Sequence, residues 1–88
     1  DTPRFKVTLG VVPDYLYDGK GMRIDGTTDG KPAARAGLQR GDVVVALGPH
    51  AVTNMTGYME ALTKFETGAE TTVTVLRDGK ELTLALKF

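Results

Sequence analysis

Hydrophobic residues along this 88-residue chain follow two spacings, one typical of strands and one typical of a helix. Two stretches near the C-terminus alternate strictly between apolar and polar positions. They flank Asp78-Gly79, which is a strong signal for a two-residue hairpin turn. Other alternating or continuous apolar runs predict further strands upstream. The predicted strands are Arg4–Val12, Gly21–Asp25, Asp42–Leu47, Glu70–Arg77 and Lys80–Lys87, with His50–Thr53 as a short return strand.

One segment has the spacing of an amphipathic helix instead. Between Met55 and Phe65 the apolar residues recur three and four positions apart, which places them on one face of a helix. Thr53 or Asn54 can supply the oxygen that caps its first free amides. A shorter helical turn is predicted in the segment AARAGL at residues 33–38. The pattern as a whole predicts an α+β fold with five or six strands, one short helix and one long helix.

The first predicted strand is interrupted within TLGVVP, residues 8–13, in a way that indicates binding. Gly10 weakens a strand interior unless another backbone or a ligand comes close, and Pro13 has no amide to donate. If the amides of Leu9, Gly10 and Val11 turn outward, they form a concave nest that suits the terminal carboxylate of a peptide. The rest of the peptide would then continue as an added strand beside residues 10–12.

An apolar wall for the peptide side chains can come from the helix. Met55, Met59 and Leu62 form a stripe at helical spacing. Each part also has a purely structural explanation, because Gly10 can make a β-bulge and such a stripe more often belongs to a hydrophobic core. From the residues alone both interpretations stay open.

The composition argues against catalysis and against several other functions. The chain has no serine, no cysteine and a single histidine, His50, so a Ser-His-Asp or Cys-His arrangement is excluded and a zinc site lacks ligands. The segment DGTTDG resembles the start of a calcium loop, but its twelfth position is Ala36 where a glutamate is required. We therefore expect no cofactor and no metal. Eleven basic and eleven acidic side chains without long like-charged runs favour neither nucleic-acid binding nor membrane insertion.

The stretch KPAARAGLQRGDVVVALGPHAV is similar to PDZ domains of the bacterial, protease-associated type. The shared features are a small-residue helical turn, the step Ala36-Gly37-Leu38, the pair Gly41-Asp42 and an apolar strand after it. TLGVVP stands where that family has its carboxylate-binding loop. The resemblance implies a PDZ-like, partly open antiparallel barrel or sandwich in the bacterial strand order, formed by residues 1–88 as one domain excised from a larger peptidase.

The resemblance also implies a site and a function. Carried over position by position, Leu9, Gly10 and Val11 form the carboxylate-binding loop. Pro13 departs from the family pattern, because the family's strand donates an amide near this position. The residues expected to line the groove are Val12, Pro13, Met55, Met59 and Leu62. The expected function is non-catalytic binding of hydrophobic peptide C-termini or extended segments by β-augmentation.

The expected parent is a bacterial peptidase. The runs LGVVPDY and GKGMRIDG look closest to the C-terminal PDZ domain of secreted zinc aminopeptidases, ahead of HtrA-type serine proteases. The parent is then expected to be periplasmic, on the cell surface or secreted. The alternative function is a structural or regulatory PDZ domain that docks on its own peptidase domain with a closed groove.

Overall fold

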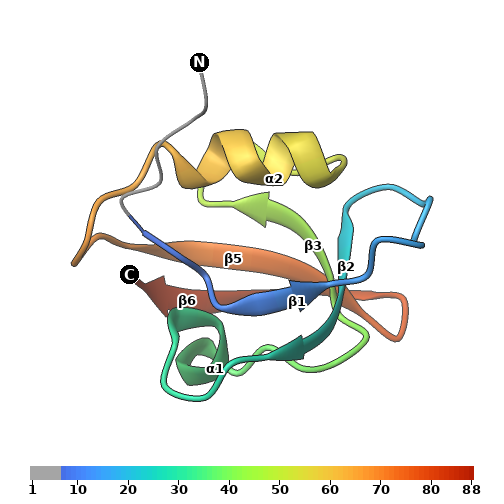
Figure 1. Cartoon of the computed structure of the whole chain (residues 1–88), viewed down its shortest axis with the longest axis horizontal. Helices are drawn as coiled ribbons and strands as arrows, with labels where there is room; N and C mark the ends of the chain where they lie inside the picture. Colours follow the sequence, from blue (N-terminus) through green and yellow to red (C-terminus); the bar gives the residue numbers. More distant parts are fainter. Residues whose placement is uncertain (1–6) are drawn as a thin grey trace.

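The computed structural model describes residues 7–88 and forms one antiparallel sheet with two helices (Figure 1). In chain order the elements are β1 (Val11–Pro13), β2 (Met22–Thr27), α1 (Pro32–Ala36), β3 (Val43–Leu47), β4 (His50–Ala51), α2 (Met55–Leu62), β5 (Glu70–Arg77) and β6 (Lys80–Lys87). The strand order is β1-β2-β3-β5-β6, with β4 paired to β3. This confirms the predicted α+β class with one short and one long helix.

The hairpin of β5 and β6 is the most regular part of the sheet. Its register runs without interruption from Glu70 opposite Lys87 to Arg77 opposite Lys80. Asp78 and Gly79 both have positive φ angles, 53° and 77°, as the tight turn between twisted strands requires. The bounds of both strands agree with the prediction because the alternating pattern and the turn specify the same register.

The core lies between the sheet and the two helices, which Figure 1 shows on opposite sides of the strands. Its side chains come from nearly every element, so the helices are held to the sheet mainly by apolar packing. The fully buried large side chains include Leu9, Ile24, Val44, Leu47, Val52, Val73 and Val75.

Asp42 is the one buried polar or charged residue in the described part of the chain. The Arg77 guanidinium donates from Nε to Asp42 Oδ1 at 2.9 Å and from Nη2 to Oδ2 at 2.8 Å, and the Gln39 amide donates to Oδ2 at 2.9 Å. Arg77 Nη2 also donates to the Gly37 carbonyl at 3.0 Å. The carboxylate therefore joins the turn after α1 to the far end of β5.

The first strand differs from the prediction of Arg4–Val12. It comprises only Val11–Pro13, and residues 7–10 belong to no strand; Arg4 to Lys6 lie outside the described residues. Two features explain the late start: Gly10 has a φ of 78°, and the Leu9 carbonyl accepts from the Ala33 amide at 2.8 Å rather than from a neighbouring strand. Pro13 is accommodated because β1 is at the end of the strand order.

The long helix also ends earlier than predicted, at Leu62 rather than Phe65. The amides of Thr63, Lys64 and Phe65 each donate to the carbonyl three residues before, which is the tighter spacing of a 3₁₀ turn. Phe65 still packs on the core, with its ring centroid 5.1 Å from that of Phe88. Of the two predicted N-cap residues it is Asn54 that caps the helix, since its Oδ1 accepts from the Gly57 amide at 2.8 Å.

Candidate functional site

The loop before β1 is fixed by two backbone carbonyls. Leu9, fully buried, anchors it in the core, and its carbonyl accepts from Ala33 N. The Gly10 carbonyl accepts from the Thr28 amide at 2.8 Å. In a trans peptide group the C=O and the following N–H point in opposite directions. The amides of Gly10 and Val11 therefore point away from Ala33 and Thr28 respectively.

The free edge of β1 follows from the same geometry. Val11 lies opposite Thr27, and the flanking bond from Thr28 N to Gly10 O makes this a pair whose own N–H and C=O groups face outward. After an irregularity in the register, Pro13 lies opposite Ile24, and the Asp14 amide donates to the Arg23 carbonyl at 2.9 Å. The backbone nitrogen and carbonyl of Pro13 are thus also directed toward the outer edge of β1. The outer edge of β1 offers the Val11 amide and carbonyl and the Pro13 carbonyl, but no amide at Pro13.

Lys31 lies against the loop, although no pattern in the sequence indicated it. A Cβ built on Gly10 would overlap Cβ and Cγ of Lys31, so the stem of the lysine packs directly on the glycine. Lys31 is exposed and precedes α1. No local pattern could have found this contact, because it joins residues from two different turns.

A surface cavity of about 260 Å³ adjoins this region. Two cations, Lys31 and Arg35, contribute to its lining, and no acidic residue does. The Arg35 guanidinium is held in place by donating to the Gly30 carbonyl at 2.5 Å and to the Lys87 carbonyl at 3.2 Å. Positive charge therefore collects next to the loop whose amides point outward. The complete lining is Val7, Thr8, Gly30, Lys31, Pro32, Arg35, Thr67 and Phe88.

The predicted apolar wall on α2 is divided between core and surface. Leu62 is 6% exposed and belongs to the core, together with Tyr58 and Ala61. Met55 is partly buried against the core, and Met59 is 39% exposed. Figure 1 shows α2 and β1 running in roughly opposite directions. Of the three stripe residues, only Met55 and Met59 therefore keep exposed surface that a ligand could contact.

The two predicted groove residues on β1 differ in exposure. Val12 is 52% exposed, whereas Pro13 is partly buried. Val11, from the loop, is partly buried and packs on the core. Side chains alternate along a strand, so Val11 and Pro13 face the core side while Val12 faces away.

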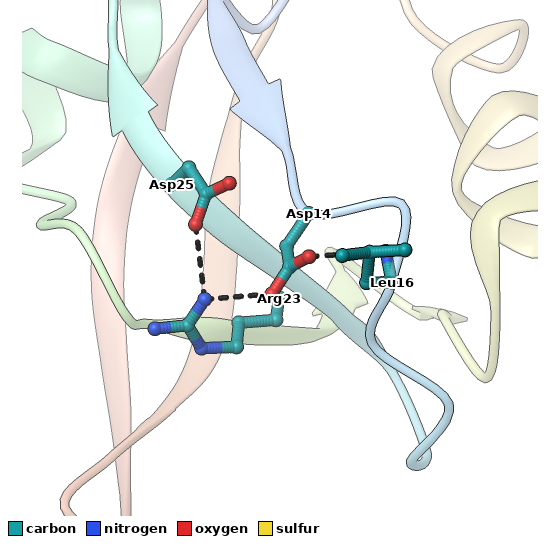
Figure 2. Close-up of polar contacts among 4 residues, drawn as sticks. All are labelled: Asp14, Leu16, Arg23 and Asp25. Atoms are coloured by element: carbon teal, nitrogen blue, oxygen red, sulfur yellow. Dashed lines mark hydrogen bonds and ion pairs between the residues drawn. The ribbon is translucent and has the colours of Figure 1, made fainter.

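Beyond β1, a polar cluster fixes the course of the chain. Arg23 Nη1 donates to Asp14 Oδ2 at 2.7 Å and to Asp25 Oδ1 at 3.0 Å, and the Leu16 amide donates to Asp14 Oδ1 at 3.0 Å (Figure 2). The hydrogen bond to Asp14 is the main cause that raises the pKa of the Arg23 guanidinium. Figure 2 shows Arg23 and Asp25 on one side of Asp14 and Leu16 on the other.

Neither a metal site nor a membrane-spanning helix is found in the part of the chain that the structure describes. Within residues 7–88 there is no group of three His, Cys, Asp or Glu side chains placed to hold a metal ion. His50 makes an edge contact with the Phe65 ring, with centroids 5.7 Å apart. Neither described helix has the length and apolar character needed to cross a bilayer.

Comparison with known families adds a decisive observation: the sequence profile of the PDZ domain matches residues 7–88. The chain belongs to the PDZ family. A PDZ domain is a peptide-binding module and is not itself catalytic, which agrees with the outward-facing edge described above and with the absence of serine and cysteine. The predicted family and the predicted function as a peptide-binding module are confirmed.

Curated relatives of this PDZ domain are HtrA-type proteases. The chain is 42% identical over 59 residues to the serine protease Do-like HtrA of Lactococcus lactis, covering 67% of the chain and 14% of that protein. It is 37% identical over 78 residues to the serine protease Do-like HtrB of Bacillus subtilis, covering 88% of the chain and 17% of that protein. The chain thus spans about one sixth of these relatives. They support a protease-associated PDZ domain, but not the prediction that aminopeptidases are the nearer relatives.

Solved structures share the fold. The HtrA-type protease AlgW with a decapeptide superimposes with a TM-score of 0.82 at 24% identity, over 94% of this chain and 29% of that one. An aminopeptidase N family protein from Idiomarina loihiensis gives a TM-score of 0.81 at 22% identity, over 94% of this chain and 14% of that one. At these identities the likeness concerns the fold alone.

Proposed function

We propose that this PDZ domain captures the C-terminal segment of a peptide as an added strand on the outer edge of β1. The observation that carries the proposal is the outward direction of the Val11 amide and carbonyl, directly after Gly10 at a φ of 78°. The amides of Leu9, Gly10 and Val11 form the cradle for the terminal carboxylate. The lysine against Gly10 adds a positive charge beside that cradle.

The apolar ligand side chains contact α2. Met55 and Met59 supply a flexible, weakly selective surface, and Leu62 supports it from the core. Val12 and Pro13 border the added strand on β1. Since Pro13 donates no amide, the ladder with the peptide is one hydrogen bond short, and we expect dissociation constants of about 10–100 µM. The AlgW structures with a decapeptide and with a tripeptide support peptide binding by this fold.

The proposed parent of the domain is an HtrA-type serine protease that acts outside the cytoplasm, in the periplasm, on the cell surface or as a secreted protein. The curated relatives support this parent. A zinc aminopeptidase parent has fold-level support only. Inhibition of the full-length parent separates the two: a serine-directed phosphonate should abolish peptidase activity, whereas a zinc chelator should leave it unchanged.

An amide chemical-shift titration tests the binding proposal. A labelled domain is titrated with a hexapeptide ending in valine and with the same peptide amidated at its C-terminus. Saturable shifts at Leu9, Gly10, Val11 and Met59 that disappear on amidation are the expected result. Shifts that are equal for both peptides would rule out carboxylate capture. No shifts up to millimolar peptide would instead favour a domain that docks on its own protease domain.

A further inference from the structure

We propose that Met59 on α2 is a site of reversible oxidation, at which hydrogen peroxide or another peroxide converts the thioether to a sulfoxide and thereby weakens the capture of peptides with apolar side chains. This inference rests on the proposed function, because it concerns the same peptide groove. Its starting point is the inventory of side chains: the chain has three methionines and neither cysteine nor tryptophan. Two-electron oxidants that reach this protein therefore react mainly with methionine sulfur.

The three methionines differ strongly in exposure. Met22, at the start of β2, is 2% exposed, and Met55, at the start of α2, is partly buried against the core. Met59 is 39% exposed. It lies at the border of the buried face of α2, because Tyr58 before it is buried and Glu60 after it is exposed. Since oxidation of methionine follows the access of the oxidant to the sulfur, Met59 reacts first.

The reaction needs nothing from the protein except an accessible sulfur. The Met59 sulfur donates an electron pair to one peroxide oxygen, and the S–O bond forms as the O–O bond breaks. The proton of the transferred hydroxyl passes to the departing hydroxide, which leaves as water. The sulfur is thus oxidised by two electrons and the peroxide is reduced by two. The product is a polar side chain whose new oxygen accepts strong hydrogen bonds.

The sulfoxide disturbs the complex with the peptide and not the free fold. In the free protein Met59 is at the surface, where water hydrogen-bonds the new oxygen, while Tyr58, Ala61 and Leu62 still hold α2 to the core. An apolar ligand side chain that covers Met59 displaces this water and offers no donor in return. The stripe neighbours Met55 and Leu62 offer none either. An acceptor buried without a partner is costly, and we expect it to weaken peptide binding about tenfold.

The first part of the test measures which methionine is oxidised. The wild-type chain carries isotope-labelled methionine methyl groups, whose NMR signals are assigned through the single variants Met22→Leu, Met55→Leu and Met59→Leu. Dilute hydrogen peroxide is added and is later removed with catalase. The methyl signal of Met59 should convert to that of the sulfoxide about tenfold faster than the signal of Met22, with Met55 between them.

The second part measures binding by calorimetry, with a methionine-free hexapeptide ending in valine, before and after oxidation. We expect the wild type to lose about tenfold in affinity at an unchanged urea midpoint, and methionine sulfoxide reductases for the two epimers to restore the affinity. Met59→Leu, compared with its own untreated form, should not respond to peroxide. Met22→Leu is the matched control, a core exchange of similar volume that should respond as the wild type does.

Each other outcome overturns the inference at a different point. Oxidation of Met22 or Met55 as fast as Met59 would remove the assignment of the site. Selective oxidation of Met59 with unchanged affinity would show that the sulfoxide does not affect binding, and would leave the proposed function intact. A urea midpoint that falls together with the affinity would mean that oxidation acts on the fold. If the untreated wild type binds the hexapeptide no better than its amidated form, the proposed function itself fails.

Discussion

Gly10 holds the backbone of the proposed carboxylate loop in the left-handed region, where a side chain is disfavoured by roughly 1–2 kcal/mol. In addition, a methyl group at this position would overlap the stem of Lys31. We expect Gly10→Ala to lower the free energy of unfolding by about 1–2 kcal/mol and to weaken peptide binding by about tenfold or more, because the loop amides must move. Urea unfolding and a peptide titration measure the two effects.

Gly26→Ala is the matched control for that variant. Gly26 lies in β2 opposite Val12, and a Cβ there meets nothing within 4 Å. Its peptide affinity should equal that of the wild type. If Gly10→Ala binds the peptide as tightly as the wild type does, the assignment of the carboxylate cradle to this loop is contradicted.

Lys31 contributes its charge to the site if the ligand carries a free carboxylate. Lys31→Gln keeps most of the stem that packs on Gly10 and removes the charge. We expect peptide affinity to fall about two- to fivefold at low salt, and the difference from wild type to vanish at about 1 M salt, where the screening length is about 3 Å. Lys80→Gln, a charge removal at the distant hairpin, should change nothing. A loss that is independent of salt would assign Lys31 a purely structural role.

Among the elements, we expect β1 to limit the affinity for peptide, because its third residue is a proline. The backbone nitrogen of Pro13 is directed toward the outer edge of β1, so Pro13→Ala presents a new amide to the ligand. One added hydrogen bond of about 0.5–1.5 kcal/mol should tighten peptide binding about two- to tenfold. The same change should cost about 0.4–1 kcal/mol of stability, because the unfolded chain gains freedom. Calorimetry with a hexapeptide and with a dipeptide measures the gain.

Ligand length is the internal control of this experiment. A dipeptide does not extend to Pro13, so its affinity should be the same for the wild type and Pro13→Ala. Equal affinities for the hexapeptide would mean that the ligand does not pair with β1 as a strand.

The elements that could be predicted from the sequence are those with a local cause. The β5–β6 hairpin was predicted with its bounds because alternation and the turn at Asp78-Gly79 agree. Helix α2 was predicted at its start, where Asn54 provides the cap, and overextended at its end. The apolar spacing continues to Phe65, but the backbone there tightens into a 3₁₀ turn. Spacing specifies which side chains face the core and not which hydrogen bonds the backbone makes.

The candidate site was predictable in part for the same reason. Gly10 and the neighbouring amides were selected as the carboxylate loop because a glycine inside an apolar run is a local anomaly, and this assignment stays a prediction. The start of β1 was wrong, because the Leu9 carbonyl is bound by Ala33 in a different element. Lys31 was missed for an equivalent reason, since its contact with Gly10 exists only after the chain has folded.

For the whole molecule, the buried Asp42 carboxylate connects segments 35 residues apart in sequence through Arg77. It also fixes the turn at Gln39, while Arg77 reaches the carbonyl of Gly37. Asp42→Asn removes the charge from these hydrogen bonds. We expect it to lower the free energy of unfolding at neutral pH by about 2 kcal/mol.

The dependence of stability on pH tests this role of Asp42. Burial by itself would raise the pKa of Asp42, but the hydrogen bonds from Arg77 and the Gln39 amide outweigh it and hold the pKa below its ordinary value of 3.8. A carboxyl group with a lowered pKa in the folded state contributes its full stabilisation above the unfolded pKa, and loses it as the pH falls through the folded pKa. The stability gap between wild type and Asp42→Asn should therefore be constant from neutral pH to about pH 4 and should narrow below that.

Urea midpoints at pH 2 to 7 measure the gap, with Asp29→Asn in an exposed turn as the control variant. A gap that widens as the pH falls below about 6 would mean that burial dominates and that the pKa is raised, because protonation would then favour the folded state. A gap unchanged down to pH 2 would mean that the charge of Asp42 does not stabilise the fold.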